Sequence, residues 1–158
     1  MADAELASLL LYLRNLTGSD FSGRTFSSRL RIQKTIYFLQ RFNHPWTREY
    51  SFGEYFHGPY SPALAADYYA LAARALRHTP SQQIDIPKNA TDFVKEALGH
   101  GNPFLETAAT LDIFLNRNPT STPTDATRHL GWLKPQLSSY ADEAITFLRK
   151  YRMIPGAT

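Results

Sequence analysis

The chain has 158 residues, of which 43% are hydrophobic and 20% charged, and its formal net charge is +3. This length suits one domain that buries its own core, and the composition excludes disordered, fibrous and coiled-coil proteins. The absence of cysteine excludes a disulfide framework, thiolate catalysis and cysteine-based metal sites. The longest apolar run, residues 9–13, is too short to cross a bilayer, and no basic segment precedes it. We therefore expect a soluble cytoplasmic protein with no membrane partner.

The first third of the chain is typical of two helices joined by a polar loop. Leucines recur at helical spacing over residues 3–16, which predicts an amphipathic helix that ends before Gly18. A second helix is predicted over residues 29–42, with Ser27 or Ser28 as its N-cap. It should end at the His-Pro pair that follows, because the residue before a proline avoids the α region.

One segment is typical of a β-strand. Tyr50, Phe52 and Phe56 alternate with small residues over residues 50–57, which is the period-2 pattern of aromatic strand formers. This segment is the one convincing strand of the sequence, and it would suit a winged-helix-like hairpin.

A tight turn into a helix is predicted after this strand. Pro59 suits the second position of a turn, and Gly58 tolerates the dihedral angles that a sharp turn requires. Ser61 suits a helix N-cap, because a proline follows it at the first helical position. We therefore expect Gly58, Pro59 and Ser61 to be structural turn residues that lead into a helix over residues 62–76.

The remainder of the chain is predicted to be mostly helical. We expect, in order, a strand-like piece at residues 84–86 and helices at 89–98, from Asn102 onwards, at 125–133 and from Ser139 onwards. Ser139 and Asp142 have the spacing of a capping box. The predicted fold is mainly α: residues 1–158 form a single helical domain with about six or seven helices and one or two short strands.

The residues favour no catalytic or metal site. The five histidines do not pair at metal-ligand spacing, and the sequence has no nucleophile elbow and no Gly-rich phosphate loop. Asp125 and His129 are spaced as a surface helix pair more than as metal ligands. Glu54, His57 and Asp67 lie near one turn, so acid–base catalysis by them stays open as an alternative. We predict a non-enzymatic protein with no cofactor and no metal.

Basic residues concentrate in the second predicted helix. Between residues 21 and 48 the sequence has no Asp or Glu. Arg31, Lys34, Phe38 and Arg41 recur at i, i+3, i+7 and i+10, which predicts a basic stripe opposite the apolar face of the helix. Such a stripe suits an acidic partner, protein or nucleic acid, and a solvated helix face is the alternative interpretation.

Two motifs resemble those of a known family. Residues 31–40 read Arg-Ile-Gln-Lys-Thr-Ile-Tyr-Phe-Leu-Gln, and residues 50–64 contain an aromatic strand that ends in Gly58-Pro59-Tyr60-Ser61. Together they resemble the small prokaryotic YwgA-like proteins and, more distantly, the Panacea (SocA-like) antitoxin domains. The resemblance implies a helical domain that binds another protein, often a toxin encoded beside it, and it implies no catalytic residues.

Our first hypothesis is a protein-binding module, antitoxin-like or adaptor-like, that regulates a toxin or defence effector, such as the product of a neighbouring gene. Tyrosine, tryptophan and arginine supply the side chains that interface hot spots use. The expected partner-binding residues are Arg31, Lys34, Tyr37, Phe38, Arg41, Tyr55, His57 and Tyr60. Packing in the core is the alternative interpretation for three of them, Tyr37, Tyr55 and Tyr60.

The alternative hypothesis comes from a different class of function. A winged-helix-like transcriptional regulator would bind DNA through the basic stripe, with the strand and turn as its wing. The net charge of +3 is low for a dedicated DNA-binding protein.

Overall fold

Seven α-helices, two short 3-10 helices and one β-hairpin form the part of the chain that the computed structural model describes, residues 3–73 and 83–155. The first half contains α1 (Asp3–Thr17), α2 (Phe26–Arg41), η1 (Pro45–Thr47), β1 (Gly53–Tyr55), β2 (Gly58–Tyr60) and α3 (Pro62–Ala73). The second half contains α4 (Lys88–Gly99), α5 (Asn102–Arg117), α6 (Pro123–Leu133), η2 (Pro135–Tyr140) and α7 (Ala141–Lys150). The prediction of a mainly α fold with a short pair of strands is therefore confirmed.

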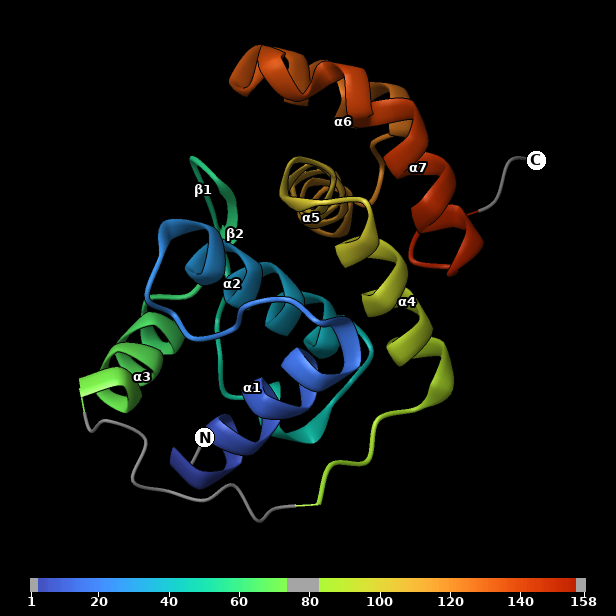
Figure 1. Cartoon of the computed structure of the whole chain (residues 1–158). Coiled ribbons are helices and arrows are strands. Elements are labelled where there is room, and N and C mark those ends of the chain that lie inside the picture. Colours follow the sequence, from blue (N-terminus) through green and yellow to red (C-terminus); the bar gives the residue numbers. More distant parts are fainter. Residues whose placement is uncertain (1–2, 74–82, 156–158) are drawn as a thin grey trace.

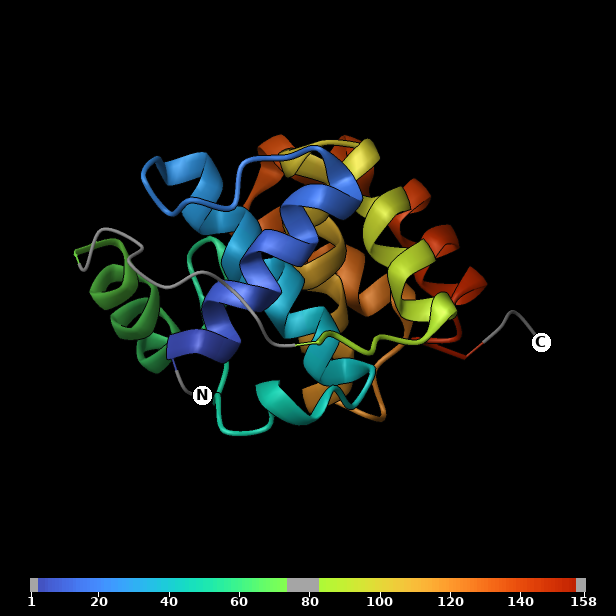
Figure 2. The same cartoon turned by 60° about the horizontal axis from the view of Figure 1, so that its bottom comes forward.

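Helix α5 lies at the centre of the fold. Figure 1 views it along its axis, with α6 and α7 on one side and α2 and the hairpin on the other. It packs against all four of these elements and against α4. After the turn of Figure 2, α3 lies at the end of the molecule opposite α4 and α7. Because α5 is surrounded in this way, its residues 104–113 are all buried, including the polar side chains of Glu106, Thr110 and Asp112.

Helix α2 begins earlier than its sequence pattern predicts. Its N-cap is Thr25, whose side chain accepts a hydrogen bond from the backbone N–H of Ser28 at 3.1 Å. The prediction of Ser27 or Ser28 as the cap is wrong, because the hydroxyl of Ser28 instead accepts from the backbone N–H of Gly23 at 2.7 Å. The earlier start places Phe26 in the first turn of the helix, where its side chain is exposed.

The hairpin differs from the predicted strand and turn. β1 and β2 pair antiparallel with Gly53 opposite Tyr60, so Gly58 and Pro59 lie in a strand and the connection falls two residues earlier, at Phe56 and His57. The prediction of Gly58 and Pro59 as the turn is therefore wrong. A proline is accommodated at the middle pair of this ladder because alternate antiparallel pairs exchange no hydrogen bonds.

Ser61 caps α3 as predicted. Its hydroxyl accepts a hydrogen bond from the backbone N–H of Leu64 at 3.2 Å. The side-chain amide of Gln33 on α2 exchanges two hydrogen bonds with the backbone of Ser61, at 2.9 and 3.0 Å. This pair of bonds holds the start of α3 against α2. The predicted helix ran to residue 76, and residues 74–76 lie outside the described part of the chain.

The other predicted helices are also present, with two local corrections in the C-terminal half. The helices at 3–16, 89–98, 102 onwards and 125–133 are present with ends shifted by two residues at most. Residues 84–86 form no strand, and the predicted capping box at Ser139 is wrong, because Ser139 lies inside η2 and α7 begins at Ala141. No helix within residues 3–73 and 83–155 has the length and apolar character that a membrane span requires.

Candidate functional site

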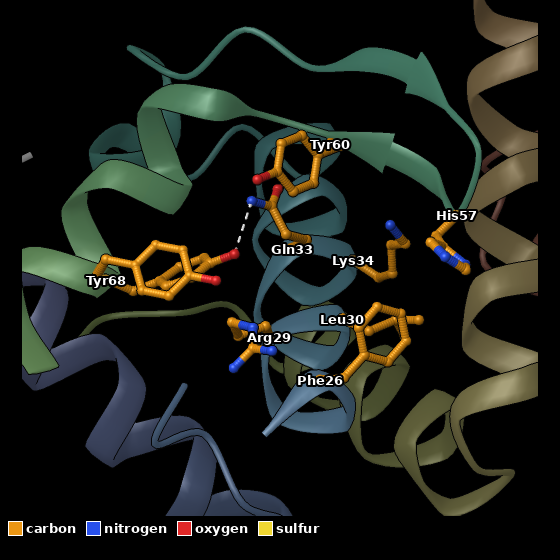
Figure 3. Close-up of a pocket in the computed structure, with 9 residues that line it drawn as sticks. Phe26, Arg29, Leu30, Gln33, Lys34, His57, Tyr60 and Tyr68 are labelled. Carbon is orange, nitrogen blue, oxygen red and sulfur yellow. Dashed lines mark hydrogen bonds between the residues drawn. The ribbon is translucent and has the colours of Figure 1, made fainter. Parts of the chain in front are cut away.

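A pocket of about 230 Å³ lies between α2, the hairpin and α3. Helix α2 lines it with Phe26, Arg29, Leu30, Gln33 and Lys34. The hairpin adds His57 and Tyr60, and α3 adds Tyr68 and Tyr69. Figure 3 shows Lys34 between Tyr60 and His57, with Arg29 further along α2. Three of these described lining residues can carry positive charge and none is acidic.

Exposed aromatic side chains surround this pocket. The ring of His57 contacts the rings of Phe26 and Phe56, with centroids 5.0 and 4.9 Å apart. Phe56, at the tip of the hairpin, is 70% exposed. We call the following five residues the aromatic rim: Phe26, Tyr55, Phe56, His57 and Tyr69. Four of them are among the six large hydrophobic side chains that are exposed in the described chain, so exposed apolar area is concentrated here.

Lys34 lies at the base of the pocket and is only 1% exposed. Its Nζ donates a hydrogen bond to the backbone carbonyl oxygen of Pro59 at 2.8 Å, which ties α2 to β2. The pKa of Lys34 is lowered to about 7, chiefly by burial and next by the nearby charge of Lys134, while Glu106 acts in the opposite direction. The expectation that Lys34 projects from an exposed basic stripe is therefore wrong.

Glu106 on α5 supplies the carboxylate beside these amines. Its Oε2 lies 3.4 Å from Nζ of Lys134, which also donates to Oγ1 of Thr110 at 3.2 Å. Its Oε1 lies 3.5 Å from Nδ1 of His57. Burial lowers the pKa of Lys134, and Glu106 opposes that shift. We call Lys34, Glu106, Thr110 and Lys134 the buried polar cluster, in which Glu106 pairs with Lys134 and acts on Lys34 through its charge.

The buried amine of Lys34 should make the stability of the fold depend on pH. Its pKa is about 7 in the folded chain, against an ordinary value of 10.5. Between these values the unfolded chain binds a proton that the folded chain lacks, so the free energy of unfolding should rise with pH, by up to about 1.4 kcal/mol per pH unit. The pKa values of Tyr37 and Tyr50 are raised, chiefly by burial, so they oppose this trend above about pH 10.

Urea unfolding between about pH 7 and 9 measures this effect. Lys34→Met, which keeps a similar volume, should flatten the rise, leaving the part that Lys134 contributes. Lys95→Met removes an amine from the exposed face of α4 and should leave the slope of the wild type unchanged. Equal slopes for the wild type and Lys34→Met would show that Lys34 keeps its ordinary pKa in the folded chain.

A second buried interaction holds α2 to α5. Asp112 on α5 is 1% exposed, and its Oδ2 accepts hydrogen bonds from the hydroxyl of Tyr37 at 2.5 Å and from Nε of Arg41 at 2.8 Å. Arg41 also donates from Nη2 to the backbone carbonyl oxygen of Met153 at 3.1 Å. Tyr37 and Phe38 are buried, so neither offers the exposed surface that the partner-binding prediction requires, and core packing, the alternative interpretation, is confirmed for Tyr37.

The remaining predicted site residues fall into two groups. Tyr60 and His57 line the pocket and Tyr55 belongs to the rim, exposed as the site prediction requires. Arg31 lies outside the pocket, half-buried, where its Nη1 donates to the backbone carbonyl oxygen of Asp20 at 2.5 Å. The predicted basic stripe is therefore interrupted, since Lys34 and Phe38 on it are buried and Arg41 is paired with Asp112.

Several residues of the site were missed by the sequence analysis. Phe26, Arg29 and Gln33 line the pocket from successive turns of α2, together with Leu30. Their spacing of three and four residues is the signal that could have found them, because it places them on one helix face. Phe26 can be found in this way only if the helix is known to begin there, three residues before the predicted start.

The three acid–base candidates are not brought together. His57 contacts Glu106, whereas Asp67 accepts a hydrogen bond from the hydroxyl of Tyr50 at 2.6 Å. Glu54 is exposed on β1. His57 and Asp67 therefore belong to two different local interactions.

Asp125 and His129 also serve separate local contacts. Asp125 completes a capping box with Thr122 at the start of α6, and His129 stacks on Phe114 with ring centroids 4.4 Å apart. In residues 3–73 and 83–155, no group of three or more His, Asp or Glu side chains is placed to hold a metal ion.

Comparisons with protein-family models, with curated proteins and with solved structures find no match for this chain. The resemblance to the YwgA-like and Panacea families rests on the motifs in residues 31–40 and 50–64. In the structure, Gln33 and Lys34 of the first motif bind the backbone of the second, at Ser61 and Pro59. The two motifs therefore form one structural unit, and the pocket lies on it.

Proposed function

We propose that this chain is a non-enzymatic protein-binding module, antitoxin-like or adaptor-like, that binds a segment of a partner protein at the pocket and its aromatic rim. The observation that carries this proposal is the concentration of exposed aromatic side chains around one pocket. Contiguous exposed apolar surface marks interaction sites on soluble proteins, whereas single exposed apolar residues do not.

The dimensions of the site favour a protein partner. The volume of about 230 Å³ is below the roughly 300–1,000 Å³ of small-molecule sites. A cavity of this size suits one or two side chains of a partner segment. Aromatic rings around it offer large, rigid contact areas, which lose little conformational entropy when a partner covers them.

The class of partner follows from the family resemblance. It favours the product of a neighbouring gene, such as a toxin or defence effector, which this chain would bind and regulate. The DNA-binding alternative depends on a continuous basic stripe. Burial of Lys34 and Phe38 removes that support, so the protein-binding proposal is the stronger of the two.

Phe56→Ser should reduce binding of the partner about tenfold or more, because it removes the most exposed ring of the rim. Its side chain is 70% exposed, so the melting temperature should change little. The measurement is affinity capture from the native host at mild salt, followed by titration with the captured protein. Trp132→Ser is the matched control, because Trp132 on α6 is 88% exposed and does not line the pocket.

Two outcomes would contradict the proposal. One is equal affinity of the wild type, Phe56→Ser and Trp132→Ser for the partner, which would show that the rim does not contribute to binding. The other is recovery of host DNA with no stoichiometric protein across several growth conditions, which would favour the regulator alternative.

A further inference from the structure

The charges around the pocket are unbalanced. Arg29, Lys34 and His57 line it, and none of the described lining residues is acidic. The nearby carboxylate of Glu106 does not line the pocket, and it is shared between His57 and Lys134 at 3.5 and 3.4 Å. Arg29 therefore gives the pocket a permanent positive charge that no described lining carboxylate offsets, and Lys34 can add a second when it is protonated.

Arg29 is positioned to meet an anion. Its Nη1 donates to the backbone carbonyl oxygen of Gly23 at 3.2 Å, and its guanidinium carbon lies 5.8 Å from the ring centroid of Tyr69. A guanidinium has five N–H donors in a planar fork that matches a carboxylate. With one donor held by Gly23 and the guanidinium over the ring of Tyr69, the other donors can face the pocket.

Lys34 supplies a second cationic group at the base. An ammonium has three donors, and one of them is held by the carbonyl oxygen of Pro59. Burial, with the second amine of Lys134 nearby, lowers the pKa of Lys34 to about 7 and so disfavours its charged form. An anion in the pocket would restore that charge and gain a charge-assisted hydrogen bond from it.

We infer that the pocket receives an acidic side chain, aspartate or glutamate, of the partner's docking segment, and that an apolar residue beside it packs on the aromatic rim. This inference rests on the proposed function and names the chemistry of the partner. A side-chain carboxylate fits the small volume and can accept from Lys34 at the base or from Arg29 further along α2, while the rim requires an apolar neighbour. A nucleic-acid backbone would need an extended basic surface in place of aromatic rings.

Selection of peptides tests the inference even while the partner is unidentified. The probe is a library of random peptides displayed as internal inserts, so that every carboxylate comes from a side chain. The wild-type chain should enrich peptides in which Asp or Glu stands next to an aromatic or aliphatic residue. Phe56→Ser, used as a parallel bait, should enrich these peptides much less.

The role of the carboxylate is then measured with the best synthetic peptide and its amide analogue, in which Glu is replaced by Gln or Asp by Asn. The amide analogue should bind the wild type about tenfold more weakly or worse, because a charge-assisted hydrogen bond is lost. Arg29→Gln should reduce the difference in affinity between the two peptides. Arg31→Gln is the matched control on the same helix outside the pocket, and it should retain the wild-type difference.

Lys34→Met provides a second test and should also reduce the difference in affinity between the two peptides. Its melting temperature shows whether the variant is folded. Enrichment of apolar peptides without an acidic preference, or an unchanged difference in Arg29→Gln, would overturn the inference and leave the proposed function standing. Failure of the wild type to enrich any peptide over Phe56→Ser, with equal capture of the partner by both, would overturn the proposed function itself.

Discussion

Gly58→Ala should lower the free energy of unfolding by about 3 kcal/mol or more. Gly58 has φ +90°, where a side chain costs about 1–2 kcal/mol. A Cβ atom there would also lie 2.7 Å from Oγ1 of Thr110, so the stiff threonine must move. That hydroxyl accepts the hydrogen bond of the buried Lys134, and weakening it adds about 1–3 kcal/mol.

Gly18→Ala separates the two contributions. Gly18 has φ +72° and no atom within 4 Å of the added Cβ position, so this variant should carry only the backbone cost. Urea unfolding of both variants at the same pH is the measurement. Equal losses for Gly18→Ala and Gly58→Ala would show that Thr110 accommodates the methyl group and that the buried polar cluster tolerates displacement.

Asp112→Ala should cost about 3–5 kcal/mol, because removal of one partner from a buried ion pair leaves the other uncompensated. The carboxylate of Asp112 accepts from both Tyr37 and Arg41, so the substitution removes two side-chain contacts between α2 and α5. The hydroxyl of Tyr37, buried in the core, would lose its acceptor.

Asp92→Ala is the matched control for this prediction. Asp92 also pairs with a cation, Lys88, at 2.7 Å, but that pair lies on the surface of α4, where water screens it. Its loss should be far smaller in the same unfolding experiment. Similar losses for Asp92→Ala and Asp112→Ala would show that the contacts of Asp112 contribute no more than a surface pair.

Local sequence signals predicted most of the helices. The leucine spacing of α1 and the glycines and prolines around α4, α5 and α6 place these helices within two residues of their ends. The N-cap at Ser61 was predicted for the same reason, since capping depends on the next three residues alone. Such signals hold because the interactions that produce them lie within one turn of the chain.

The hairpin was predicted in the right region, but its strands and its connection were misplaced. The aromatic alternation over residues 50–57 suggested one strand, whereas the ladder pairs Gly53 with Tyr60 across the connection at Phe56 and His57. The pairing of two strands depends on both segments and on the elements that pack against them. Here Lys34 of α2 donates a hydrogen bond to the carbonyl oxygen of Pro59 in β2. A pattern within one segment carries no information on that contact.

Four residues of the pocket and its rim had been named from the sequence. His57, Tyr60, Tyr55 and Lys34 were named from the motifs, and all four lie in or beside the pocket. The predicted environment of Lys34 was wrong, because an argument from helical periodicity assigns every lysine to the exposed face. Its burial depends on partners that lie far from it along the chain.

The sequence by itself determined the mainly α class, the helices whose periodicity and caps are local, and the segments that carry the site. Only the tertiary structure decided which polar side chains are buried. The packing of α2, the hairpin and η2 around α5 encloses Lys34, Lys134 and Glu106, while it leaves Phe26, Phe56 and the other rings of the rim exposed. Burial is decided in this way because it is a property of the whole packed core, where a charged group is tolerated only if distant segments supply its partners.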